Sequence, residues 1–150
     1  MKPLIVLLIS FLIVIVVFIL MRREVDFALS ARIALAAMLV FTAVGHFVYN
    51  QGMTLMLPQF VPYKKELVYF TGVIEVIAAV GLLIHNVRVL TAWSLILFFI
   101  MLLPANIYAA AKHIDYQKAT YDGNGFAYLW FRVPLQILFI VWTYISAIRF

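Results

Sequence analysis

Five continuous apolar segments, separated by short polar stretches, make up most of this chain of 150 residues. They cover approximately residues 4–21, 30–49, 66–84, 89–111 and 126–148. Each approaches the ~20 residues that an α-helix needs to cross about 30 Å of hydrocarbon. Because the segments are continuous rather than alternating, a transmembrane barrel is not expected. The pattern predicts an all-α membrane helix bundle in which residues 1–150 form a single transmembrane domain.

The first segment, Leu4 to Met21, has the apolar character of a signal peptide, but Arg22 and Arg23 follow it instead of a small-residue cleavage site. We therefore interpret it as a retained transmembrane helix. It contains no Gly, Ala or Thr, the residues that allow close contact between membrane helices. A peripheral, lipid-facing position is expected for it.

The connections between the segments also carry information. Residues 52–62 are apolar but include Pro58 and Pro62, so we expect a segment at the membrane interface that is not helical throughout. Pro104 is expected to interrupt the fourth helix. Residues 112–125 form the longest polar loop and end in the turn-forming sequence Asp-Gly-Asn-Gly.

Composition narrows the class of protein. The chain is 67% hydrophobic and 11% charged, which excludes an ordinary soluble domain. It has no cysteine, so disulfide and dithiol chemistry are excluded. The net charge of +5 is spread over helix flanks, and without a basic patch no nucleic-acid partner is expected. Arg22, Arg23 and Arg88 adjoin the helices most closely, so the positive-inside rule places the arginine end in the cytoplasm and the N-terminus and the 112–125 loop outside.

Glu75 is the most informative residue, because it is the ninth residue of the apolar segment from Leu67 to Ile84. A charged side chain at bilayer depth costs roughly 2.5–3.5 kcal/mol, so such residues usually face a protein interior and mark functional sites. Measured from the lysine end, His46 lies roughly 6 Å inside, Arg132 roughly 9 Å, Glu75 roughly 13 Å and Gln136 roughly 15 Å. With Asn106, five polar side chains on four helices occupy the same half of the membrane.

The helical faces agree with this grouping. Arg132 and Gln136 are four residues apart and share a face. Glu75 shares a face with small residues that would admit a neighbouring helix: Thr71, Gly72, Ala78 and Ala79. We expect Glu75 to pair with Arg132, since a buried carboxylate is tolerated when it is paired. Asn106 and Tyr108 follow the expected break at Pro104, where polar groups would line a cavity.

Several catalytic and metal motifs are absent from the sequence. There is no HExxH, no phosphate-binding glycine loop and no nucleophile elbow. His85 falls at the opposite end from His46 and His113, so a bis-histidine haem is not expected. Metal-ligand spacing is also missing, and no metal is predicted.

Four stretches together resemble the DoxX-like (DoxX/DoxD) family of small integral membrane proteins: Gly45-His46-Phe47; Thr71 to Glu75 with Gly81-Leu82-Leu83; Pro104 to Tyr108; and Arg132 to Gln136 with Trp142. The resemblance covers about residues 30–144. It implies a four-helix core, with the first helix as an addition, and places His46, Glu75, Asn106, Arg132 and Gln136 at characteristic positions of that family. It also implies a bacterial inner (plasma) membrane and a link to quinone chemistry or to membrane redox complexes.

Three hypotheses follow for function. The first is binding of a small amphiphile (a quinone, isoprenoid or lipid) by His46, Glu75, Asn106, Tyr108, Arg132 and Gln136, with the chain as a membrane subunit of a redox system. The second is an isomerase or oxidoreductase with few cofactors, in which Glu75 is the catalytic acid or base. The third is a scaffold or assembly factor in which the Glu–Arg cluster is structural and a membrane protein is the partner.

Overall fold

Helices make up about three quarters of the computed structural model, which describes residues 2–150. Within this range the order is α1 (Lys2–Leu20), α2 (Phe27–Val48), α3 (Asn50–Leu55), α4 (Lys64–Gly81), α5 (Arg88–Ala111), α6 (Phe126–Thr143) and the π-helix η1 (Tyr144–Arg149). Residues 2–150 contain no strand beyond one isolated bridge between Asp115 and Thr120. The prediction of an all-α bundle is confirmed.

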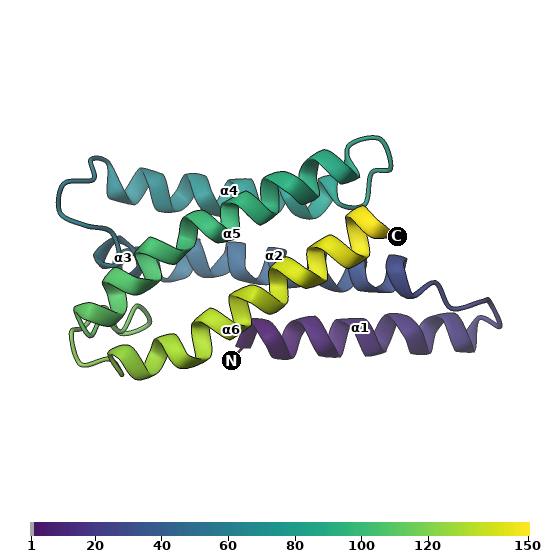
Figure 1. Cartoon of the computed structure of the whole chain (residues 1–150), viewed down its shortest axis with the longest axis horizontal. Helices are drawn as coiled ribbons and strands as arrows, with labels where there is room; N and C mark the ends of the chain where they lie inside the picture. The colour runs from purple at the N-terminus through teal and green to yellow at the C-terminus, as the bar shows by residue number, and fades with distance from the viewer. Residues whose placement is uncertain (1) are drawn as a thin grey trace.

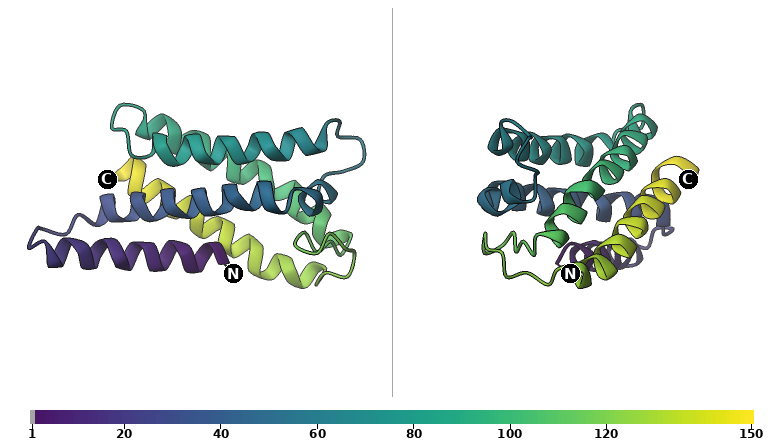
Figure 2. Two further views of the ribbon diagram at one scale, coloured as in Figure 1. Left: turned by 180° about the vertical axis from the view of Figure 1, so that it is seen from behind. Right: turned by 60° about the vertical axis from the view of Figure 1, so that its left-hand side comes forward.

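The helices form two layers. In Figure 1, α1, α2 and α4 lie side by side with α2 in the centre, and α5 and α6 cross them obliquely in front. The view from behind in Figure 2 reverses this order, with α1, α2 and α4 in front. The two layers meet at the end of the bundle that holds the C-terminus, because η1 packs against both α2 and α5 there.

Among residues 2–150, four helices are long and apolar enough to cross a membrane: α1, α2, α5, and α6 continued by η1. The expected fifth span, α4, has 18 residues and carries Lys64, Lys65, Glu66 and Glu75. It packs along α2 for much of its length, and its role as a span stays a prediction. The first helix is peripheral as expected, since Leu7 is its only buried residue among 2–20.

Small side chains explain why the layers close at one end. The apolar core there contains Ala34 and Ala36 from α2, Ala78 from α4, Ala92 from α5 and Ala147 from η1. In a membrane, helices gain no hydrophobic advantage from pairing, so close van der Waals contact between small residues holds them together. The core thus concentrates at the arginine end and leaves the opposite end of the layers free to diverge.

The connections at the opposite end are folded against one another. The segment after α2 forms the short helix α3 and then continues without regular helix to α4, in agreement with the expectation from Pro58 and Pro62. Gly52 of α3 approaches the Tyr116 backbone so closely that a Cβ atom would collide with the Tyr116 carbonyl oxygen. Tyr116 belongs to the 112–125 loop between α5 and α6. In that loop the Thr120 hydroxyl donates a hydrogen bond to Asp122, which holds the pKa of the Asp122 carboxyl below its usual value.

The expected interruption at Pro104 is wrong, because α5 is continuous from Arg88 to Ala111. Proline removes one backbone donor, and a membrane helix tolerates that loss when neighbouring helices supply polar groups. Here Gln136 of α6 donates a hydrogen bond to the Phe99 carbonyl, in the turn that precedes the proline. The carbonyl that loses its donor to the proline is that of Ile100, so the bond from Gln136 ties the adjacent residue of α5 to α6 and does not replace the missing bond.

The contact between α2 and α4 depends on Gly72. A Cβ atom at this position would lie 2.9 Å from the His46 Cβ and 3.4 Å from the Ala43 carbonyl oxygen. Gly45 of α2 is different, since the atom nearest to a Cβ placed there would be Met53 Cε at 3.8 Å. Close backbone contact thus occurs at Gly72 and not at Gly45.

This difference predicts unequal effects of two alanine substitutions. Gly72→Ala should lower the thermal stability of the purified protein in detergent relative to Gly45→Ala, by about 1–3 kcal/mol, because the added methyl forces the two helices apart. Both substitutions give the same gain in helix propensity, so Gly45→Ala is the matched control. Equal melting temperatures for the two variants would contradict the close contact at Gly72.

Candidate functional site

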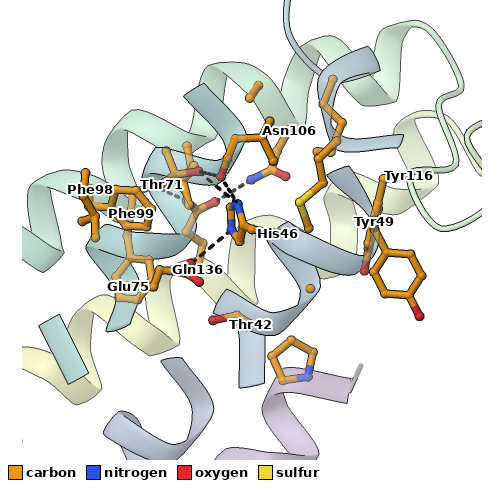
Figure 3. A pocket seen from close by; sticks show the side chains of 18 of the residues that line it. Thr42, His46, Tyr49, Thr71, Glu75, Phe98, Phe99, Asn106, Tyr116 and Gln136 are labelled. Carbon is orange, nitrogen blue, oxygen red and sulfur yellow. Dashed lines mark hydrogen bonds and ion pairs between the residues drawn. The ribbon is translucent and has the colours of Figure 1, made fainter. Parts of the chain in front are cut away.

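A cavity of about 800 Å³ lies between the two layers at the end where they diverge. Its wall includes the second half of α2, the first two thirds of α4, the middle of α5 and much of α6. Most of this wall is apolar, and Phe98, Phe99 and Leu135 contribute to it. Figure 3 shows His46, Glu75, Asn106 and Gln136 gathered at one part of the cavity. The predicted grouping of polar side chains at a common depth is therefore present.

His46 is fixed by α4 through one of its ring nitrogens. Its Nδ1 lies 3.2 Å from the Val68 carbonyl oxygen and 3.0 Å from the Thr71 hydroxyl oxygen. The Thr71 hydroxyl donates its single hydrogen to the same carbonyl, at 2.8 Å. Both neighbours of Nδ1 are therefore acceptors, and the network assigns a proton to Nδ1. The other ring nitrogen, Nε2, is directed toward Glu75 (Figure 3).

Glu75 pairs with His46, and the predicted pair with Arg132 is wrong. The distance between His46 Nε2 and Glu75 Oε1 is 3.4 Å, and Glu75 is 4% exposed. Among residues 2–150, Arg132 forms no ion pair or side-chain hydrogen bond. The cause is packing: Gly72 brings α4 against α2, while α6 belongs to the other layer. Glu75 Oε2 is buried and has no hydrogen-bond partner among the residues that the structure describes.

Asn106 and Gln136 form a second polar pair, between α5 and α6. The Asn106 amide nitrogen donates to Gln136 Oε1 at 3.4 Å, and the Gln136 amide donates to the Phe99 carbonyl. Both side chains are buried. Each polar pair thus joins two helices of the same layer, and both pairs line the cavity.

Arg132 lines the cavity as predicted, but Tyr108 does not. Tyr108 follows Asn106 by two residues, about 200° around a helix, so the two side chains cannot share a face. Thr71 was expected only as a small residue that admits a neighbouring helix, although its spacing of four residues before Glu75 was a signal that both side chains face the same neighbour. Tyr49, Tyr116 and Thr42 also line the cavity.

A second buried polar group lies at the arginine end and was not anticipated. Ser30, Arg32, Thr143 and Ser146 are all buried there. Arg32 Nε has no hydrogen-bond partner within residues 2–150, while the Trp142 indole donates to the Ala31 carbonyl at 3.0 Å. Arg32 is therefore a buried residue of α2 and not an exposed charge beside the helix.

The site combines a histidine–carboxylate contact, two amides and a guanidinium around apolar space. Within residues 2–150 no three His, Asp or Glu side chains gather as a set of metal ligands. The His46–Glu75 pair can bind a proton or a polar headgroup, and the apolar wall suits a hydrocarbon tail. The arrangement is typical of a small-molecule site in which few polar groups fix the orientation of an apolar ligand.

A double-mutant cycle distinguishes the observed partner of Glu75 from the expected one. Glu75→Leu and His46→Leu should each destabilise the protein by leaving a buried polar partner, and the double variant should lose less than their sum, by about 0.5–3 kcal/mol. Glu75→Leu and Arg132→Leu should instead be additive within about 0.5 kcal/mol. Thermal unfolding in detergent measures both cycles, and strong coupling to Arg132 alone would contradict the observed pairing.

Neither a curated protein nor a solved structure matches this chain. One family model, described as a domain of unknown function (DUF8561), matches residues 35–147. The match includes most of α2 and continues into η1, so it contains both polar pairs and Arg132, and it begins after α1. The chain belongs to the DUF8561 family.

Proposed function

We propose that this protein binds a small amphiphilic molecule in the cavity between its two helix layers. The observation that carries this proposal is the cavity of about 800 Å³ itself, which brings apolar walls together with His46, Glu75, Asn106, Arg132 and Gln136. Ligand cavities in proteins are usually about 300–1,000 Å³, largely apolar, with a few convergent polar groups. A buried carboxylate at bilayer depth is costly, and its position at such a cavity supports a functional role.

The polar side chains would hold the headgroup and the apolar wall would hold the tail. His46–Glu75 and Asn106–Gln136 lie on opposite layers, so a headgroup between them would contact both. Phe98, Leu97 and Met101 of α5 supply apolar wall beyond this level. Quinones, isoprenoids and lipids all combine a polar head with such a tail.

The resemblance to DoxX-like proteins also supports binding of an amphiphile. It would make this chain a bacterial inner-membrane protein, possessing a quinone-related or redox partner, with the 112–125 loop outside and the cavity in the outer half of the bilayer. The helix α1, which the matched residues do not include, would then be an addition at the edge of the bundle.

A second candidate is acid–base catalysis on the bound molecule. The specific observation in its favour is the 3.4 Å contact between His46 Nε2 and Glu75 Oε1 at the cavity wall. The two side chains together would hold one exchangeable proton at the cavity wall, which a general acid–base step requires. If the cluster instead only holds the fold together, as in a scaffold, filling the cavity should leave function and ligand content unchanged.

Filling the cavity tests ligand binding directly. Ala105 lines the cavity on α5, and Ala105→Phe should remove co-purifying small molecules because the ring occupies the space they need. Ala111→Phe is the matched control, since Ala111 is an exposed residue near the end of the same helix. Native mass spectrometry of protein released from lipid particles measures bound species directly.

We expect a bound amphiphile on the unaltered protein and on Ala111→Phe, and at least a tenfold lower occupancy on Ala105→Phe, since a filled site loses several kcal/mol of contact. If all three proteins carry the same species in the same proportion, the cavity is not the binding site. If none carries a bound molecule, even after incubation with decylubiquinone and farnesol, the proposed function is wrong.

A further inference from the structure

We propose that the headgroup of the ligand is an anion, a carboxylate or a phosphate, and that Arg132 binds it. This inference rests on the proposed function and specifies the chemical class of its ligand. It follows from the charges that remain at the cavity once Glu75 pairs with His46 rather than with Arg132.

The proton count of the His46–Glu75 pair comes first. Nδ1 carries a proton, because its neighbours Val68 O and Thr71 Oγ1 both accept. If neither Nε2 nor Oε1 held a proton, two acceptors would face each other at 3.4 Å in an apolar site and would repel. One proton therefore lies between them. Whether it resides on the imidazole or on the carboxyl group, the pair as a whole has no net charge.

Arg132 is consequently the uncompensated charge of the polar group. Among the described residues that line the cavity, Glu75 is the only acid, and Lys2 is the only other fixed cation. The remaining titratable side chains that line it are the neutral phenols of Tyr49, Tyr116 and Tyr128. Arg132 is partly buried, and within residues 2–150 it has no ion pair and no side-chain hydrogen bond.

A partly desolvated guanidinium favours a specific kind of partner. Arginine presents a planar set of donors that matches carboxylate and phosphate oxygens in two parallel hydrogen bonds. A neutral headgroup, such as a quinone carbonyl, could accept one of these bonds but would leave the charge uncompensated in a poorly polar environment. An anion satisfies both the donors and the charge, while Asn106 and Gln136, on the same layer as Arg132, supply further polar contacts.

Three probes with the same sixteen-carbon tail test this inference: palmitate, monohexadecyl phosphate and the neutral hexadecanol. Binding of each to the full chain in phosphatidylcholine nanodiscs is measured by native mass spectrometry. At least one anion should bind about tenfold or more tightly than the alcohol, since a hydrogen bond to a charged group contributes that much. A preference for the carboxylate or for the phosphate identifies which of the two headgroups the site takes.

Arg132→Gln should abolish the preference for the anion and leave the affinity for hexadecanol unchanged. Arg132→Lys should keep part of the preference for the anion, because lysine retains the positive charge but lacks the two parallel donors of the guanidinium. Arg149→Gln, at the other end of the bundle, is the control and should keep the full preference. If a variant fails to fold, the comparison of the three probes on the unaltered protein still tests whether the site prefers an anion.

The outcomes separate the two proposals. If hexadecanol binds as tightly as both anions, the anionic headgroup is ruled out while amphiphile binding stands. If the preference survives in Arg132→Gln, the assignment to Arg132 is wrong. If none of the three probes binds, the cavity does not hold an amphiphile, and the proposed function fails together with this inference.

Discussion

The contact between His46 and Glu75 determines the organisation of the polar site. It exists because Gly72 lets α4 approach the backbone of α2, which places the carboxylate 3.4 Å from the imidazole. A lone carboxylate buried between helices would carry a large desolvation cost, and a partner on an adjacent helix reduces it. The hydrogen bond of Nδ1 to α4 then fixes the ring, so that two helices of one layer are joined at a single level.

Glu75 is the only acid among the described residues that line the cavity, so its pairing with His46 leaves no carboxylate for the helices of the other layer. Within the described part of the chain, Arg132 of α6 has no acidic partner, and Asn106 and Gln136 bond to each other and to the α5 backbone. The layers are joined by small residues and η1 at the arginine end, and no polar bond between described side chains of the two layers crosses the cavity. The space between them is therefore lined by two separate polar pairs and an unpaired cation.

The helices were largely predictable from the sequence, because membrane-spanning helices need long apolar segments whose limits are set by bilayer thickness. The grouping of His46, Glu75, Asn106, Arg132 and Gln136 was predictable too, since depth along a helix follows directly from residue number. The pairing of these side chains was not, because depth says nothing about rotation or about which helices are neighbours. The choice of His46 over Arg132 required the layer arrangement, and the continuity of α5 through Pro104 became clear only from the structure.

The most direct test is an electron cryo-microscopy map of the protein in particles of native membrane. We predict that α4 and α5 lie apart at the level of Glu75, with elongated non-protein density between them whose polar end lies between Arg132 and the His46–Glu75 pair. A map in which α5 and α6 close onto α4, with Arg132 bonded to Glu75 and no space left between the layers, would contradict it.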